Sequence, residues 1–230
     1  TNLNGDFSFT SNNLVRNYET NVFEKTNIND LIFNSNPKIS NYGFYNNYDF
    51  ILKNVNSDTQ KSDGFKEDEN YYFSGLFQFN SSLPMIKENG NLQKIMKPKL
   101  TVKFSPNDTK DLRKDENRLD VNNVYDLNRL SSNETIEGGI SLTYGNDFTI
   151  SDKKNSKELF GFKIANNLRF EENQDLPQAN QLGQKTSNIL SEIIYNPYDS
   201  LSLKYNTTIE NNIQDVSYQN LVAAISVNNF

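Results

Sequence analysis

The stretch Phe160-Gly-Phe-Lys-Ile-Ala-Asn-Asn-Leu-Arg-Phe170 places apolar and polar side chains at largely alternate positions. Successive side chains of a β-strand point to opposite faces, so this period of two predicts a strand. A helix would instead mix Phe with Lys and Asn on the same face. One face of the expected strand carries Phe160, Phe162, Ile164, Leu168 and Phe170, and the other carries Lys163, Asn167 and Arg169.

The same alternation recurs along most of the chain. Between residues 201 and 209, Leu201, Leu203, Tyr205 and Ile209 alternate with Ser202, Lys204, Asn206 and Thr208. Aromatic and β-branched residues, which strands favour, crowd each such run. We therefore expect an all-β chain of about eleven strands. They lie near residues 5–11, 14–25, 31–39, 42–55, 70–82, 96–105, 119–127, 134–150, 158–171, 186–209 (two strands, broken near Pro197) and 216–229.

The segments between the expected strands differ in length. Asn196-Pro-Tyr-Asp-Ser200 is a tight-turn sequence, because Asn, Pro and Asp favour turns. Residues 56–70, 105–118 and 171–185 are long and polar. Short turns that alternate with long loops are typical of transmembrane β-barrels. No internal repeat or Pro/Gly-rich linker divides the sequence, so residues 1–230 are expected to be one section of a single domain.

Composition argues against several other classes of protein. The net charge of -6 and the lack of a basic stripe make nucleic acid an unexpected partner. No run reaches the roughly 18 apolar residues of a membrane helix, whereas a barrel strand needs only about 9–11 residues, every second one of which can be polar. Hydrophobic residues make up only 35% of the chain, as expected for a wide, water-filled barrel.

Catalytic and metal-binding groups are scarce. The chain has no Cys and no His, which excludes a Cys or His nucleophile–base pair, a His-dependent triad and an ordinary zinc site. The charged run Asn107–Asn117 lacks the spacing of a calcium loop and predicts a solvated loop. Glu171 and Glu172 lie beside a strand end, and we do not expect them to act as glycosidase acids. We therefore expect a protein that is not an enzyme and needs no cofactor.

Residues 118–145 carry the most specific motif. They read Arg118-Leu-Asp-Val-Asn-Asn-Val-Tyr-Asp-Leu-Asn-Arg-Leu-Ser-Ser-Asn-Glu-Thr-Ile-Glu-Gly-Gly-Ile-Ser-Leu-Thr-Tyr-Gly145. This stretch resembles a hallmark of the LptD family of lipopolysaccharide-assembly proteins. The resemblance continues in residues 97–106 and 160–188, while Ser132, Asn133 and Thr135 depart from the family pattern. The matching positions are Asn123, Tyr125, Asn128, Arg129, Glu137, Gly139, Tyr144 and Gly145.

The resemblance implies a translocon in the outer membrane of a Gram-negative bacterium. Such proteins receive lipopolysaccharide from periplasmic Lpt bridge proteins through an amino-terminal domain. An LptE-like lipoprotein plugs their barrel, and the lipid leaves sideways into the outer leaflet. This chain would be a middle section of the antiparallel transmembrane β-barrel, and by itself a curved, open meander sheet of about 10–11 strands. The amino-terminal domain and the gate strands would lie outside it.

The alternating runs would then separate the lumen of the barrel from outer-membrane lipid. A charge facing lipid at the bilayer midplane costs roughly 2–4 kcal/mol, whereas a lumen position contacts water. Arg129 and Glu137 flank a turn centred on residues 131–133, and we expect them to meet in a charged network on the lumen side. Lumen-facing residues would be Lys163, Asn167, Arg169, Lys204 and Asn206, and lipid-facing residues Phe160, Phe162, Ile164, Leu201 and Leu203.

Two alternatives share parts of this pattern. Another outer-membrane barrel, such as a porin or a receptor, would have similar strands without the motif in residues 118–145. A soluble β-sandwich or adhesin domain would pack its apolar faces against each other and join its strands by short, similar loops.

Overall fold

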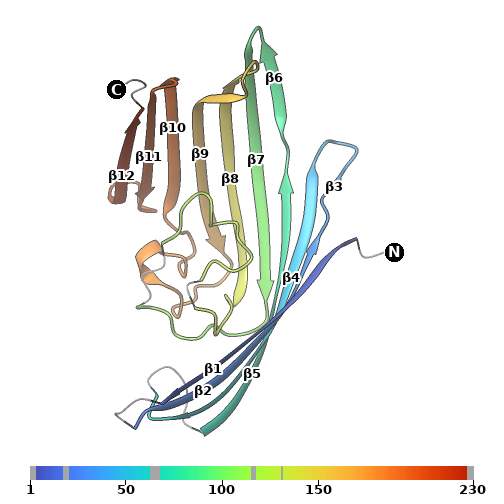
Figure 1. Cartoon of the computed structure of the whole chain (residues 1–230), viewed down its shortest axis with the longest axis vertical. Coiled ribbons are helices and arrows are strands. Elements are labelled where there is room, and N and C mark those ends of the chain that lie inside the picture. Colours follow the sequence, from blue (N-terminus) through green and yellow to red (C-terminus); the bar gives the residue numbers. More distant parts are fainter. Residues whose placement is uncertain (1–3, 18–20, 63–67, 115–117, 131, 227–230) are drawn as a thin grey trace.

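A computed structural model describes residues 4–17, 21–62, 68–114, 118–130 and 132–226. Within them, twelve strands form one antiparallel sheet, and the only helix is the 3-10 helix η1 (Gln178–Asn180) (Figure 1). No helix in these ranges is long and apolar enough to cross a membrane. The strands are β1 (Gly5–Asn17), β2 (Phe23–Ser35), β3 (Lys38–Ile39), β4 (Tyr45–Gln60), β5 (Asp68–Ser82), β6 (Met85–Asn89), β7 (Leu92–Ser105), β8 (Gly139–Asp152), β9 (Lys157–Arg169), β10 (Ile189–Tyr198), β11 (Leu201–Ile209) and β12 (Val216–Ile225).

The strands form a meander in chain order, β1-β2-β4-β5-β7-β8-β9-β10-β11-β12, while short β3 and β6 pair with β4 and β7. The sheet is open, with β1 and β12 at its edges. It is also strongly twisted, because β1, β2 and β5 turn away from the direction of β7 to β12 (Figure 1). The expectation of an all-β, antiparallel open sheet with almost no helix is confirmed, with twelve strands in place of about 10–11.

Strand register sorts the side chains onto two faces. On the first, which we call the apolar face, Phe7, Phe33, Phe50, Phe77 and Phe104 pair in that order across five strands. The rings of the first three pack together, with centroids 4.6 Å apart for Phe7 and Phe33 and 5.5 Å apart for Phe33 and Phe50. Since every second residue shares a face, the apolar face continues over β8 to β11. On these strands the apolar face carries Phe148, Phe162, Ile193 and Tyr205. We call the opposite face the polar face. It carries Lys53, Gln78, Lys103, Thr143, Asn167, Glu192 and Lys204.

The two longest connections, residues 106–138 and 170–188, fold back over β8 and β9 (Figure 1). They cover the polar face, where their described parts share a hydrophobic core with the sheet. Residues 115–117 lie outside the described part of the chain. For residues 107–114 the prediction of a solvated loop is only partly correct, because Leu112 is buried while Asp111 and Arg113 are exposed. The core comprises Leu112, Leu119, Val121, Val124, Leu130, Leu176 and Leu182 of the connections, with Ala165 of β9 and Leu190 of β10.

The strand expected at residues 119–127 is wrong, because this segment forms turns. The Asp120 carboxylate accepts hydrogen bonds from the backbone N–H groups of Asn122 and Asn123, which bends the chain. The alternation of Leu119 and Val121, which suggested a strand, instead places both side chains in the core of the connection.

Other boundaries differ from expectation in simpler ways. The strands expected at 5–11 and 14–25 are not separate, because Asn12 and Asn13 continue the β1 ladder opposite β2. Strand β8 begins at Gly139 instead of residue 134, and β6 was not expected. The connection expected at 56–70 is shorter, since the strands that flank it extend into both of its ends. The tight turn after Asn196 is confirmed between β10 and β11.

The open edges generate a first prediction. In the described part of the chain, β1 and β12 each have one side without a strand neighbour, and such edges promote aggregation. Residues 1–230 produced alone should aggregate in aqueous buffer and stay dispersed only in detergent or lipid. Size-exclusion chromatography with and without detergent measures this, and a dispersed monomer in buffer alone would contradict it.

Candidate functional site

A buried ionic cluster joins the first long connection to the polar face of the sheet. Its centre is the carboxylate of Glu137, which is only 4% exposed. Glu137 Oε2 accepts a hydrogen bond from Arg129 Nε at 2.6 Å, and Oε1 accepts one from Arg129 Nη2 at 2.7 Å. This is the bidentate geometry in which guanidinium and carboxylate planes match. Arg169, the last residue of β9, also donates to Glu137 Oε1.

Arg129 contacts three separate parts of the chain at once. Its Nη2 donates to Ser141 Oγ of β8 and to Asn167 Oδ1 of β9, both at 2.9 Å. Its Nη1 donates to Thr143 Oγ1 of β8 at 3.0 Å and to the Val124 carbonyl oxygen at 3.2 Å. The donors of a guanidinium are fixed in one plane, so these acceptors together determine its orientation. Arg129 therefore fixes the connection against two neighbouring strands.

Two further cations lie beside the same carboxylate. Arg169 Nη2 donates to the Gly138 carbonyl oxygen, and Lys103 Nζ of β7 donates to the carbonyl oxygens of Asp126 and Leu127. Both cationic side chains are buried. A buried charge is costly unless it is hydrogen-bonded or paired. The backbone carbonyl groups of the connection therefore stabilise the cations that one carboxylate cannot neutralise.

The surroundings of Glu137 keep it ionised at neutral pH. Burial by itself would raise the pKa of this carboxyl group, because it disfavours the charged form. The charge and hydrogen bonds of Arg129, with further attraction from Lys103 and Arg169, outweigh burial and hold the pKa below its usual value of 4.5. The cluster thus retains its pairing of charges throughout the neutral range.

A second ionic group lies on the polar face of β9 to β11. Glu192 of β10 is 1% exposed and lies between Lys163 of β9, at 2.9 Å, and Lys204 of β11, at 2.7 Å. Lys163 Nζ also donates to Asn122 Oδ1 in the long connection, at 3.0 Å. Glu192 therefore links three adjacent strands through side chains, in addition to their backbone ladder.

The two sets of strand residues singled out in the sequence lie on opposite faces of the sheet. Lys163, Asn167, Arg169, Lys204 and Asn206 belong to the polar face, and Phe160, Phe162, Ile164, Leu201 and Leu203 to the apolar face. The expected meeting of Arg129 and Glu137 is confirmed by their ion pair.

Three further motif residues determine the local shape of the first connection and the start of β8. Asn123 Oδ1 accepts a hydrogen bond from the Asp120 N–H, and Asn128 Oδ1 accepts one from the Leu130 N–H. Gly139 begins β8 with a φ of 86°, a left-handed conformation that favours glycine.

Of the last three motif residues, Tyr125 and Gly145 lie where the connection meets β8, and Tyr144 lies on the other face of the sheet. Tyr125 packs against the core of the connection, and its ring lies 4.1 Å from Lys99 Nζ. Gly145 gives room for this ring, since a Cβ there would approach the Tyr125 hydroxyl to 2.2 Å. Tyr144 lies on the apolar face opposite Leu100.

Sequence reasoning missed Glu192 and the role of Lys103. Both faces of β10 carry apolar residues, namely Leu190 and Ile194 on one and Ile193 on the other, so the alternation does not single out Glu192. Lys103 occupies a clear polar position in the alternating run of β7. Its carbonyl partners lie in the segment that was expected to be a strand, so no local signal revealed the contact.

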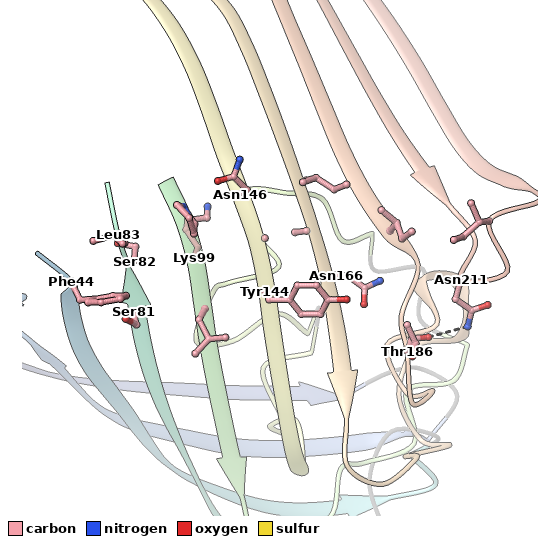
Figure 2. Close-up of a pocket in the computed structure, with 17 residues that line it drawn as sticks. Phe44, Ser81, Ser82, Leu83, Lys99, Tyr144, Asn146, Asn166, Thr186 and Asn211 are labelled. Atoms are coloured by element: carbon pink, nitrogen blue, oxygen red, sulfur yellow. Dashed lines mark hydrogen bonds between the residues drawn. The ribbon is translucent and has the colours of Figure 1, made fainter. Parts of the chain in front are cut away.

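A groove of about 840 Å³ crosses the apolar face over β7, β8 and β9 (Figure 2). Tyr144 and Ile164 are among the residues that line it. A polar residue in the lining, Asn166, donates from Nδ2 to the carbonyl oxygens of Ser187 and Asn188 at 2.9 and 3.3 Å. Part of its polarity is therefore satisfied by the backbone of the neighbouring connection.

Together these features form a wall with one apolar and one polar side. Across residues 4–226, apart from the short undescribed gaps, no group of three Asp or Glu side chains is placed to hold a metal ion. The ionic clusters join strands and connections to each other.

Comparisons with known proteins agree with the motif. The family model described as LptD: LPS transport system D matches residues 6–229. The match covers nearly the whole chain, including the first connection, the ionic cluster and both faces of the sheet. A search of the curated proteins gives no match.

The Arg129–Glu137 pair generates a second prediction. Arg129→Ala and Glu137→Ala should each lower the free energy of unfolding of the full-length barrel, because each removes a charged partner from a buried charge. A double-mutant cycle should give a coupling energy of about 1–3 kcal/mol. The exposed Arg113–Asp111 pair on the same connection is a matched control and should give no measurable coupling. Equal coupling for the two pairs, measured by denaturant unfolding in detergent, would contradict the bracing role.

The lowered pKa of Glu137 generates a third prediction. A carboxyl group with a depressed pKa in the folded state stabilises that state above its usual pKa of 4.5, and this contribution is lost as the pH falls through that value toward the folded pKa. The stability advantage of the native protein over Glu137→Gln should therefore shrink between about pH 7 and about pH 3. Denaturant unfolding at a series of pH values measures it, and a constant difference would show that Glu137 is not held by its charge.

Proposed function

The chain belongs to the LptD family, and on that premise we propose that it forms part of the barrel wall of a translocon that inserts lipopolysaccharide into the outer leaflet. Membership assigns the chain to lipopolysaccharide transport, an outer-membrane process of Gram-negative bacteria, with lipopolysaccharide as the substrate. The observation that carries the finer proposal is the continuous row of apolar side chains on one face from β1 to β11, opposite the buried charges of the polar face.

The apolar face would contact outer-membrane lipid. In the part of the chain that the structure describes no second sheet covers it, and Phe9 and Phe73 are 66% and 63% exposed. A soluble β-sandwich would cover such a face with a second sheet. In a bilayer the acyl chains supply that layer, because strands that cross a membrane place apolar side chains outward.

The polar face would line the lumen. Buried Arg129, Arg169 and Lys103 hold the first connection against this face. The connection would thereby stiffen the inner wall of the barrel. We propose that an LptE-like lipoprotein plugs this lumen and that periplasmic Lpt bridge proteins deliver lipopolysaccharide through a separate amino-terminal domain. In this proposal residues 1–230 are a single section of the barrel domain. It needs no catalytic residue and no cofactor, since the chain would supply only a path.

Neighbouring residues of β9 provide a fourth prediction. In the full-length protein, Phe162→Arg should block assembly, because an arginine that faces lipid near the midplane costs roughly 2–4 kcal/mol. Lys163→Gln should assemble, because it leaves Glu192 paired with Lys204 on the polar face. Heat-modifiable mobility on gels reports assembly of the barrel. Equal behaviour of the two variants would contradict the assignment of the faces.

Labels separate lipid contact from simple burial. Fluorescent labels at Phe162 and Leu203 should be quenched by lipid-borne quenchers, and labels at Lys163 and Lys204 by aqueous ones. A response of all four labels to aqueous quenchers alone would remove the barrel proposal.

A further inference from the structure

The apolar face changes character abruptly on β1, β2 and β4. The paired residues Phe9, Leu31 and Leu52 form its last fully apolar row. Two residues further along each strand, toward the end where the long connections emerge, the next two rows are polar. The first consists of Ser11, Asn29 and Asn54, and the second of Asn13, Asn27 and Asn56. We call these six residues the asparagine patch.

The amide groups of the patch are bonded to one another across the strands. Asn27 Nδ2 donates to Asn13 Oδ1 at 2.6 Å, and Asn29 Nδ2 donates to Asn54 Oδ1 at 3.1 Å. Asn56 Nδ2 donates to Asn27 Oδ1 at 3.0 Å and to Asn54 Oδ1 at 2.7 Å. The patch is thus an ordered, uncharged lattice of hydrogen-bond donors and acceptors, and its order lowers the entropy cost of binding.

The position of the patch places it beyond the hydrocarbon layer. Strand β4 has 16 residues, and a tilted strand needs only about 9–11 to cross the hydrocarbon. Beside the patch on β5, Phe73 pairs with Asn54 and Tyr71 pairs with Asn56. Both aromatic side chains are well exposed, at 63% and 72%. Exposed aromatic residues at the border of an apolar band are typical of the membrane interface.

The chemistry of the patch identifies what it contacts. Long connections of membrane barrels lie on the extracellular side, so the patch lies at the outer leaflet. It carries no charge, and the charged residues Lys25 and Asp58 appear only in the following row. Neutral amides hydrogen-bond well to hydroxyl groups, whereas anion recognition generally uses Arg or Lys. We propose that the asparagine patch binds the saccharide portion of outer-leaflet glycolipid, an inference that rests on the proposed function.

Nitroxide labels in the full-length protein test this. Labels are placed at Asn56 in the patch, at Leu52 on the same strand and face, and at Asn46 near the other end of β4. Collision with oxygen and with a water-soluble nickel chelate is measured in phospholipid bilayers and in bilayers that contain lipopolysaccharide. The label at Leu52 should favour oxygen in both. The label at Asn56 should be open to nickel in phospholipid and lose that access severalfold with lipopolysaccharide, while the label at Asn46 does not change.

Variants test the role of the amides. With the label at Asn56, the double change Asn27→Leu and Asn54→Leu should abolish most of the saccharide-dependent protection, whereas Asn46→Leu should preserve it. An Asn56 label that favours oxygen, or nickel access that lipopolysaccharide leaves unchanged, would overturn the inference while Leu52 still reports lipid. A Leu52 label that does not favour oxygen would instead overturn the proposed function.

Discussion

Strand register is the constraint on which the rest of this structure depends. Each strand of the meander pairs with its neighbours in an antiparallel ladder, and the two-residue period of one strand is thereby aligned with that of the next. The row from Phe7 to Phe104 shows the result, because five phenyl rings from five strands share one face. A slip of one residue in any strand would exchange its two faces, and in β7 it would bring Lys103 into the phenylalanine row. Both faces, the ionic clusters and the asparagine patch rely on this alignment.

The polar face shows how long connections can be fixed against such a wall. The hydrophobic core around Val124 and Leu182 removes apolar surface from water but does not select one orientation. Arg129 supplies that selection, since its donors meet acceptors from the connection, β8 and β9 together. A buried ion pair contributes little net stability relative to apolar packing. Its contribution here is to position the connection.

The apolar face raises a different question, namely what covers its side chains. A sheet in water normally covers an apolar face with another layer of protein. Among the described residues no second sheet covers the outward Phe and Leu side chains, which is consistent with membership of an outer-membrane family. Lipid would supply the second layer over the apolar rows. In that proposal, the change from Leu52 to Asn54 along β4 would mark the level at which hydrocarbon gives way to a hydrogen-bonding environment.

The sequence by itself determined the all-β class, the two faces and the family motif, because the direction of a side chain along a strand is a local property with a period of two. It also indicated that Arg129 and Glu137 would meet, since they are close in sequence and flank one turn. It could not show that residues 119–127 form turns. The alternation of Leu119 and Val121 is the same whether their side chains pack on a sheet or in the core of a connection. Only the tertiary structure decided that Arg169 reaches Glu137, 32 residues away in sequence, and that Glu192 lies between two lysines. The first contact depends on how the connection folds back onto the polar face, and the second depends on the register of β9, β10 and β11. The local alternation of side chains determines neither.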